Sequence, residues 1–448
     1  MTNTIANIFR IPELRNRILF TFAMLAIYRL GIFIPAPGVD RHALSQFFSE
    51  QSNTLFGLYD MFSGGALEQF SVFVLGIMPY ISASIIMQLL VVVVPQLERL
   101  KKEGQSGQNK ITQYTRYMTI GIALIQSFSI SMGLEQMRTA GGQDVVISGG
   151  ISFRLMTMIT MSAGACFVMW LGEQITDRGI GNGASLIITG GIVAGLPAAM
   201  AQTFTLLQTG NINLLAMVLL VGFMFVVIAA IVFIERGQRR VPIQYAKRVI
   251  GQRVYGGQAT HLPLKVNVAG VIPPIFASSV LMLPATVGSF WPDNMLLGEA
   301  SQAFYPGAWM YNVTYIGLIV FFSYFYTAMT FNPVDVADNL KKHGGYVPGI
   351  RPGKQTADYL DRILTRLTAG GAAYLAAICL LPTFLITEYG IPFYFGGTGL
   401  LIVVAVSLDT VAQIEAHLLT RHYDGLASGN QGGRARHRRA LEREKKGE

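Results

Sequence analysis

The chain has little charge. Only 13% of its 448 residues are Asp, Glu, Lys or Arg, whereas 52% are hydrophobic, and the mean hydropathy is +0.45. A soluble globular protein needs more polar side chains than this to cover its surface. The composition therefore excludes a soluble globule and indicates a polytopic membrane protein.

The residue types that carry most enzyme chemistry are also few and scattered. Cys166 and Cys379 both fall within apolar runs, far apart in the sequence, which is typical of packing residues rather than of a disulfide or a metal pair. All six histidines lie outside the centres of the apolar segments. We therefore expect no enzyme activity, no metal and no cofactor.

Acidic side chains are missing from the centres of the second to ninth apolar segments. Arg29, Asp409 and Glu415 are the main charged exceptions, and they lie in the first and last segments. Ion-coupled transporters usually hold carboxylates near the membrane midplane, so the absence argues against that class. An ion-coupled secondary transporter of small solutes stays the alternative, because broken helices and opposed halves are common to it as well.

What the chain does have is ten apolar segments, each long enough to cross a bilayer as a helix. The predicted fold class is accordingly an all-α polytopic membrane protein with ten transmembrane helices. The expected spans cover about 18–37, 69–97, 117–134, 155–173, 184–206, 212–234, 266–290, 308–332, 367–387 and 393–414.

Lysine and arginine indicate how these spans are oriented. With the N-terminus inside, the loops on the inner side hold nearly all the basic residues, and the outer loops hold only Arg41 and Arg138, with Arg154 at a span edge. Cytoplasmic loops retain positive charge during insertion, so both termini are predicted to be cytoplasmic. Ten spans with both ends inside can form two five-span halves of opposite orientation, 1–206 and 207–448.

The second span has an unusual mixture of side chains. Ile77, Ile81 and Ile85 recur at every fourth position and share one helix face, while Ser82 and Gln88 lie on a neighbouring face. A helix surrounded only by lipid has no need of the polar pair. The isoleucine face either packs against sister helices or lines a functional site, and this pattern alone leaves both open.

A short segment between the first two spans, about 53–70, is apolar but too short and too rich in glycine to cross the membrane. Irregular backbone at membrane depth is tolerated only inside protein or in a water-filled cavity. The segment is therefore either re-entrant or an interfacial loop.

Two long basic loops, about 236–265 and 333–365, are predicted on the cytoplasmic side, followed by a basic tail at 419–448. Polar and β-branched or aromatic residues alternate around Val254 and Tyr255, which favours a short hairpin. Proline and glycine flank Arg351 and favour a rigid tip that presents one guanidinium. Such charge either fixes topology and binds anionic lipid, or docks a phosphate-rich or acidic partner.

The order of these features resembles the SecY family of protein-conducting channels from the first span to the tenth. A doubled proline, Pro273-Pro274, departs from the family pattern and is expected to weaken the seventh helix, and the arginine-rich tail is a second departure. The stretches that carry the resemblance are Phe62–Leu67, Gly76–Ile85, Gln113–Tyr117, Trp170–Thr176, Arg178–Gly183, Glu235–Arg240, Thr260–Asn267, Gly349–Gly353 and Pro392–Thr398.

The resemblance implies an hourglass pore between the two halves. An apolar collar would close its waist, a re-entrant plug would close it from outside, and a lateral gate between spans 2–3 and 7–8 would open to lipid. The implied collar residues are Ile77, Ile81, Ile188, Ile275, Ser279 and Ile402. The implied plug residues are Phe62, Ser63, Gly64, Gly65, Ala66 and Leu67. The implied lateral-gate residues are Ser82, Gln88, Gln126, Ser278 and Leu283, and the implied docking residues are Arg239, Arg240, Arg253 and Arg351.

The resemblance also implies the function and the partners. Unfolded secretory proteins would cross the bacterial plasma membrane through the pore, and membrane-protein helices would leave sideways into lipid. Energy must then come from a bound motor or a translating ribosome. The implied partners are the SecE and SecG subunits, the SecA motor ATPase, the ribosome with its ribosomal RNA, SecDF, YidC, signal peptides, nascent chains and membrane lipids.

Overall fold

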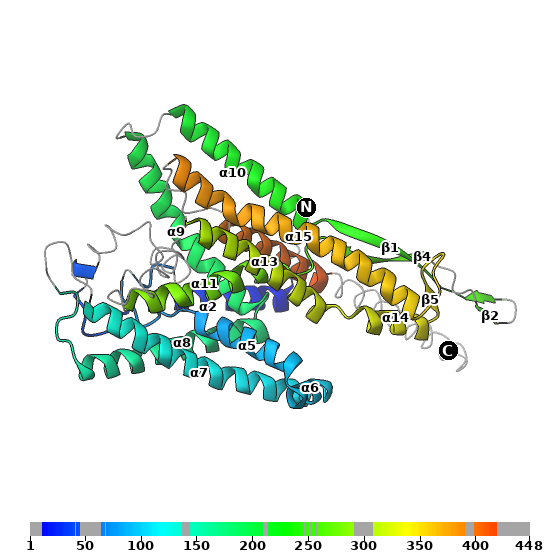
Figure 1. The fold of residues 1–448 in the computed structure, drawn as a ribbon, viewed down its shortest axis with the longest axis horizontal. Coiled ribbons are helices and arrows are strands. Elements are labelled where there is room, and N and C mark those ends of the chain that lie inside the picture. Colours follow the sequence, from blue (N-terminus) through cyan, green and yellow to red (C-terminus); the bar gives the residue numbers. More distant parts are fainter. Residues whose placement is uncertain are drawn as a thin grey trace, which may run out of the picture.

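The structure is a computed structural model of the whole chain, and the residues that it describes lie in eleven ranges. They are 11–40, 42–44, 64–67, 69–136, 144–208, 214–245, 248–250, 253–255, 259–290, 308–389 and 398–418. Within these ranges the chain is mostly helical, and the long helices run side by side in an elongated bundle (Figure 1).

The helices follow the chain in a simple order. The first half contains α2 (Pro12–Ile32), α5 (Met78–Val93), α6 (Pro95–Lys102), α7 (Gln105–Gln136), α8 (Ile151–Arg178) and α9 (Gly183–Gln208). The second half contains α10 (Leu214–Glu235), α11 (Ile272–Phe290), α13 (Trp309–Thr330), α14 (Pro333–Lys342), α15 (Lys354–Tyr389) and a last helix, Thr398–Leu418.

Each of the ten expected spans overlaps a helix of the structure. Among the described residues, six helices are by themselves long and apolar enough to cross a membrane, and the number rises to seven if α5 and α6 count as one broken span. The multi-pass helical fold is therefore confirmed, whereas the count of ten stays a prediction.

The second span differs from the single helix expected over 69–97. Residues 69–77 form turns, in which Gly76 has a φ of +53°, and α5 begins only at Met78. Its axis then turns by 97° into α6. The turn lies at Val94, which is extended as expected for a residue before a proline, and Pro95 starts the next helix.

The doubled proline of the seventh span does not interrupt the helix that carries it. Because α11 begins at Ile272, Pro273 and Pro274 fall in its first turn. Backbone N–H groups in a first turn have no partner within the helix, so the prolines remove no helical hydrogen bond there. The expected weakening of this helix was wrong for that reason.

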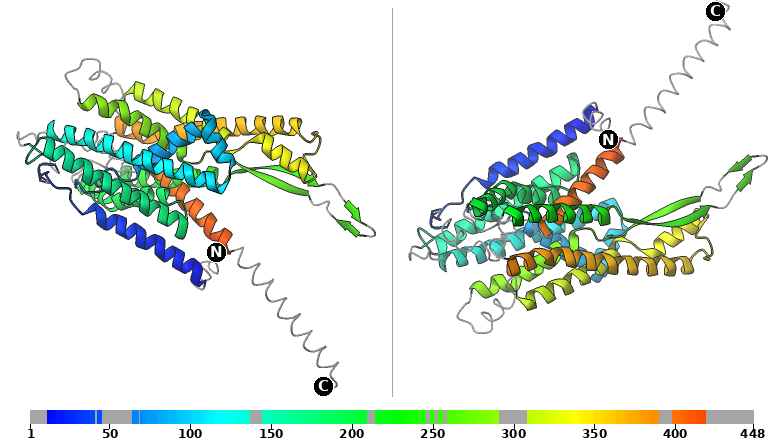
Figure 2. Two further views of the ribbon diagram at one scale, coloured as in Figure 1. Left: turned by 90° about the horizontal axis from the view of Figure 1, so that it is seen from below. Right: turned by 90° about the horizontal axis from the view of Figure 1, so that it is seen from above.

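A small antiparallel sheet extends from one end of the bundle, as both views of Figure 2 show. β1 (Gln238–Tyr245) pairs with β4 (Ala259–Lys265) on one side and with β5 (Gly345–Tyr346) on the other. β2 (Arg248–Ile250) and β3 (Arg253–Tyr255) form the short hairpin expected near Val254. The sheet joins the two basic loops, a connection that the sequence did not predict.

The main apolar core crosses the predicted boundary between the halves. One cluster of buried side chains receives members from α2, α5, α8, α9, α10, α11, α13, α15 and the last helix. A smaller cluster, which includes Val241, Leu264, Val347 and Ile363, lies under the sheet. The two halves therefore share one apolar core, and the sheet packs on a second, smaller apolar core.

Candidate functional site

The isoleucines expected at the collar lie together in the main core. Ile77, Ile188, Ile275 and Ile402 have exposed fractions of 3%, 1%, 7% and 0%, and Ile81 packs against the same cluster. They come from the start of α5, from α9, from α11 and from the last helix. The fold thus gathers four distant segments at one apolar place. Because the cluster contains many other residues, the arrangement of these side chains as a collar around a pore stays a prediction.

The polar member of the expected collar is satisfied within its own helix. The Ser279 hydroxyl donates to the carbonyl oxygen of Ile275 at 2.8 Å, and the Ser278 hydroxyl donates to the same oxygen at 2.9 Å. Such bonds let a serine lie in a membrane helix without a partner on another helix. The hydroxyl groups of Ser278 and Ser279 beside Ile275 are therefore already hydrogen-bonded.

The described part of the expected plug is folded against the bundle. Ala66 and Leu67 are buried, and Gly64 and Gly65 have φ values of +73° and +85°, which favour glycine. The Arg29 guanidinium of α2 donates to the Gly64 carbonyl oxygen. Phe62 and Ser63 lie outside the described residues. Deep burial of Ala66 favours a re-entrant segment over an interfacial loop.

Helices of the two halves are in contact in the region where the lateral gate is expected. α11 lies against both α5 and α7. Leu283 belongs to α11, but its side chain is outside the described part of the chain. This contact of α11 with α5 and α7, called the seam below, lies where the lateral gate is expected, and the gate itself stays a prediction.

Hydrogen bonds along this contact run within helices. Gln88 Nε2 donates to Ser84 Oγ at 3.2 Å, one turn earlier in α5. The side-chain oxygens of Gln88 and Gln126 are buried and have no hydrogen-bond partner in the described chain. Ser82 is half-buried. Among the described residues, no side-chain hydrogen bond is thus seen between α11 and α5 or α7. Apolar side chains form the contact there.

A cavity of about 190 Å³ lies where α5, α6 and α7 meet Met329 of α13. Gln88, Ser84 and Lys101 contribute to its wall.

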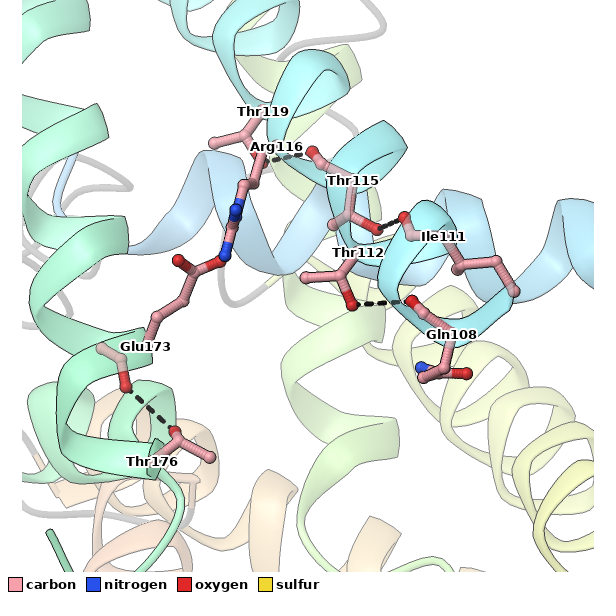
Figure 3. A network of polar contacts seen from close by, with 9 residues as sticks. Gln108, Ile111, Thr112, Thr115, Arg116, Thr119, Glu173 and Thr176 are labelled. Atoms are coloured by element: carbon pink, nitrogen blue, oxygen red, sulfur yellow. Dashed lines mark hydrogen bonds and ion pairs between the residues drawn. The ribbon is translucent and has the colours of Figure 1, made fainter. Parts of the chain in front are cut away.

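Polar residues of α7 are arranged so that few need a partner elsewhere (Figure 3). Thr112, Thr115 and Thr119 each donate to the carbonyl oxygen four residues earlier, at 2.8–3.0 Å. Arg116 Nε instead reaches across to Glu173 Oε1 of α8 at 2.8 Å. This ion pair joins α7 to α8, so the α7 side of the seam is fixed to the rest of its half.

The expected docking arginines lie on and beside the sheet. Arg239 and Arg240 are exposed on β1, and Arg253 lies on β3 with its side chain outside the described residues. Arg351 is exposed, whereas its neighbour Ile350 packs against the small core under the sheet.

Hydrogen bonds fix the turn that carries Arg351. Ile350 N donates to the Val347 carbonyl oxygen at 3.1 Å, and the Thr356 hydroxyl donates to the Arg351 carbonyl oxygen at 2.9 Å. Gly349 and Gly353 have φ values of +81° and +103°, which only glycine adopts readily. These bonds and glycine turns agree with the rigid tip expected from the sequence, which stays a prediction.

Comparison with known proteins gives the family. The family model described as SecY matches residues 71–411. The chain is 51% identical over 419 residues to the protein translocase subunit SecY of Pseudomonas aeruginosa, covering 93% of each chain. It is 50% identical over 415 residues to that of Escherichia coli, covering 92% of this chain and 93% of the other.

Solved structures share the fold at much lower sequence identity. One is described as a protein-conducting channel, with a TM-score of 0.62 and 17% identity over 92% of this chain and 96% of that chain. Another is Sec61 in the canine ribosome-channel complex, with a TM-score of 0.59, 17% identity and the same coverage. The whole-length likeness to named relatives, on a fold shared with these channels, shows that the chain belongs to the SecY family.

Proposed function

We propose that this protein is the channel through which unfolded secretory proteins cross the bacterial plasma membrane, and from which membrane-protein helices pass sideways into lipid. The observation that carries the proposal is 51% identity to a protein translocase subunit over 93% of the chain. Membership of a channel family also agrees with the expectation that the chain is not an enzyme. No comparison supports the alternative of an ion-coupled transporter.

The buried isoleucines supply a physical reason why such a channel does not leak. An ion is strongly penalised in a narrow apolar constriction, which can close by excluding water. Aliphatic side chains also part around a polypeptide of any sequence, since they make no specific polar contact. The collar of Ile77, Ile81, Ile188, Ile275, Ser279 and Ile402 would seal the pore in this way.

The contact of α11 with α5 and α7 is the proposed exit into lipid. Because no described hydrogen bond crosses it, apolar packing is what an inserting signal peptide must replace. A hydrophobic signal peptide offers equivalent packing, so it can part the helices at low cost. Ser82, Gln88, Gln126, Ser278 and Leu283 line this seam in the proposal.

The proposed topology places both termini and the sheet in the cytoplasm. It divides the ten spans into halves at 1–206 and 207–448, with the plug at about 53–70. Basic residues concentrated in the loops around the sheet support this orientation.

The sheet surface is the proposed site for cytoplasmic partners. Two solved relatives, canine Sec61 and yeast Ssh1, are described in complexes with ribosomes. The exposed Arg239 and Arg240 of β1, and the exposed Arg351 on its hydrogen-bonded turn, suit ribosomal RNA or an acidic face of the SecA motor. SecE, SecG, SecDF, YidC and membrane lipids are proposed partners within the membrane.

Reconstitution tests the function directly. Purified complex in proteoliposomes, supplied with the motor ATPase and ATP, should move a secretory precursor to a protease-protected site. Vesicles without ATP and vesicles without this subunit are the matched controls. ATP-dependent protection that is equal with and without the subunit would contradict the proposal.

A further inference from the structure

Arg29 is a charged side chain near the end of a helix that has much apolar surface. It belongs to the last turns of α2, a helix whose apolar surface includes the exposed Phe22 and Leu30. Charged residues in membrane helices are costly and usually have a functional partner. The Arg29 side chain is only half-exposed and does not simply extend into solvent.

The partner that the structure gives Arg29 is the backbone of the re-entrant segment. Arg29 Nη1 donates to the carbonyl oxygen of Gly64, 35 residues further along the chain. The same guanidinium lies 5.6 Å from the ring centroid of Phe33, close enough for a cation–π contact. Arg29 is thus held at one side of the Gly64 turn.

Gly64 is enclosed from the other side as well. A Cβ atom added to Gly64 would lie 2.8 Å from the Cα atom of Gly191 in α9, a distance that real Cβ atoms essentially never show. The same added atom would lie 3.5 Å from Arg29 Nη1. Gly64 therefore fits between the Arg29 side chain of α2 and the backbone of α9.

The chain that follows Gly64 is fixed by backbone hydrogen bonds. Ala36 N donates to the Phe70 carbonyl oxygen at 2.8 Å, and Val72 N donates to the Ile34 carbonyl oxygen at 2.9 Å. These bonds fasten residues 70–72 to the segment after α2. The Gly64 turn lies beyond this fastened part, and the charged Arg29 side chain contacts it there.

We infer that Arg29 is a latch that holds the plug closed by binding the Gly64 carbonyl oxygen. The inference rests on the proposed channel function, in which the segment around Gly64 closes the pore. A hydrogen bond from a charged donor is stronger than one between neutral groups and gains further strength away from water. It can still break and re-form, because water entering an opened pore can hydrate the guanidinium.

The main test replaces Arg29 with methionine in the complete membrane complex. Arg29→Met keeps a long side chain without its donors. Chloride efflux from vesicles carrying the idle complex should rise by about 10-fold or more, the effect of losing one charge-assisted hydrogen bond. Export of a precursor with a defective signal sequence should rise in parallel, since less work is needed to displace the plug.

Two further variants control for general damage to α2. Arg17→Met removes a cation from the same helix that forms a surface pair with Glu13 at 3.7 Å, so it should leave efflux unchanged. Arg29→Lys keeps a charged donor and should lower the leak below that of Arg29→Met. Equal leaks from Arg17→Met and Arg29→Met, or no rescue by lysine, would overturn the inference.

A double-variant cycle tests the contact itself. Gly64→Ala cannot keep its turn against Gly191, so it should leak by itself, and adding Arg29→Met should then have little further effect. Fully additive leaks would overturn the latch. So would an Arg29→Met complex as ion-tight as the parent, while collar variants such as Ile402→Asn leak. If no variant leaks and no precursor is exported, the proposed channel function fails instead.

Discussion

At the scale of single residues, the isoleucines of the proposed collar combine two properties that a gate for polypeptides would need. Their side chains exclude water, and they have no directed bonds that would select a sequence. Ile188 and Ile402 are almost completely buried although they come from opposite halves of the chain. A polar group placed at either position would have to be hydrated or left unpaired.

We predict that asparagine at the collar hydrates the waist. Ile275→Asn and Ile402→Asn should increase ion efflux by roughly 10-fold or more, since a few kcal/mol of dewetting penalty is removed. They should also relax signal-peptide selectivity. Conductance across a planar bilayer and export of defective precursors measure both effects.

Ile402→Leu and Ile275→Leu are the matched controls, because they keep an aliphatic side chain of equal volume. They should stay close to the parent in conductance. If several asparagine variants are as ion-tight and as selective as the parent, the collar assignment is wrong.

The second prediction at this scale concerns Arg351, whose turn is fixed by the bonds of Ile350 and Thr356. Arg351→Glu should reduce motor-driven export by about 30-fold, the effect of breaking a close charge pair at an interface. Arg351→Lys should also export poorly if the contact is bidentate. ATP-dependent export into inverted membrane vesicles is the measurement.

Lys342→Glu makes the same charge change in the same loop, at the exposed end of α14, and should have a much smaller effect. If Arg351→Glu exports normally at normal membrane abundance, Arg351 makes no docking contact. Its charge would then serve only to set the orientation of the chain in the membrane.

At the scale of elements, each apolar segment of the sequence overlaps a helix of the structure, but hydropathy did not show where each helix begins. The expected span at 69–97 includes Gly76, whose positive φ ends the turns before α5, and Pro95, which begins α6. Apolar composition cannot distinguish buried turns from helix, because both avoid water. For α11, the position of the prolines within the helix mattered. Pro273 and Pro274 lie in its first turn, where they remove no helical hydrogen bond, whereas the sequence did not show where the helix begins.

The seam shows a similar limit. The sequence placed Ser82, Gln88, Ser278 and Ser279 on facing helices, but it could not show where their hydrogen bonds go. In the structure Ser278 and Ser279 both donate to the carbonyl oxygen of Ile275 in their own helix. A helix carbonyl within reach satisfies a hydroxyl without any partner helix, so composition alone overstates polar contact between helices.

We predict that locking the seam stops both routes of transport. After replacement of Cys166 and Cys379, cysteine pairs scanned over 82–87 and 278–283 should include some that oxidise readily, because α5 and α11 are in contact. The disulfide should block secretion and release of membrane helices without unfolding the protein. Pulse-labelled export and protease protection report the two activities.

A longer flexible crosslinker at the same pair is the control, and it should restore passage because the helices can then part. The seam assignment fails if no pair crosslinks, or if a fully locked seam still exports and inserts substrates at the normal rate.

At the scale of the whole molecule, one apolar core joins the helices of both halves, while a separate small core supports the sheet. The sequence predicted the basic loops and the hairpin, but not that β5 would connect the second loop to the first. β5 is only two residues long, which is too short for an alternating hydrophobic pattern that would predict a strand.

The central claim is that polypeptides pass through the waist. The most direct measurement is photocrosslinking to a precursor stalled during ATP-driven export, with the photoreactive residue at Ile77, Ile275 or Ile402. Phe225 of α10, which is 69% exposed on the apolar surface, is the control position. The account predicts adducts with the precursor at the three waist positions and none at Phe225. Absence of waist adducts during active export, or equal adducts at Phe225, would contradict it.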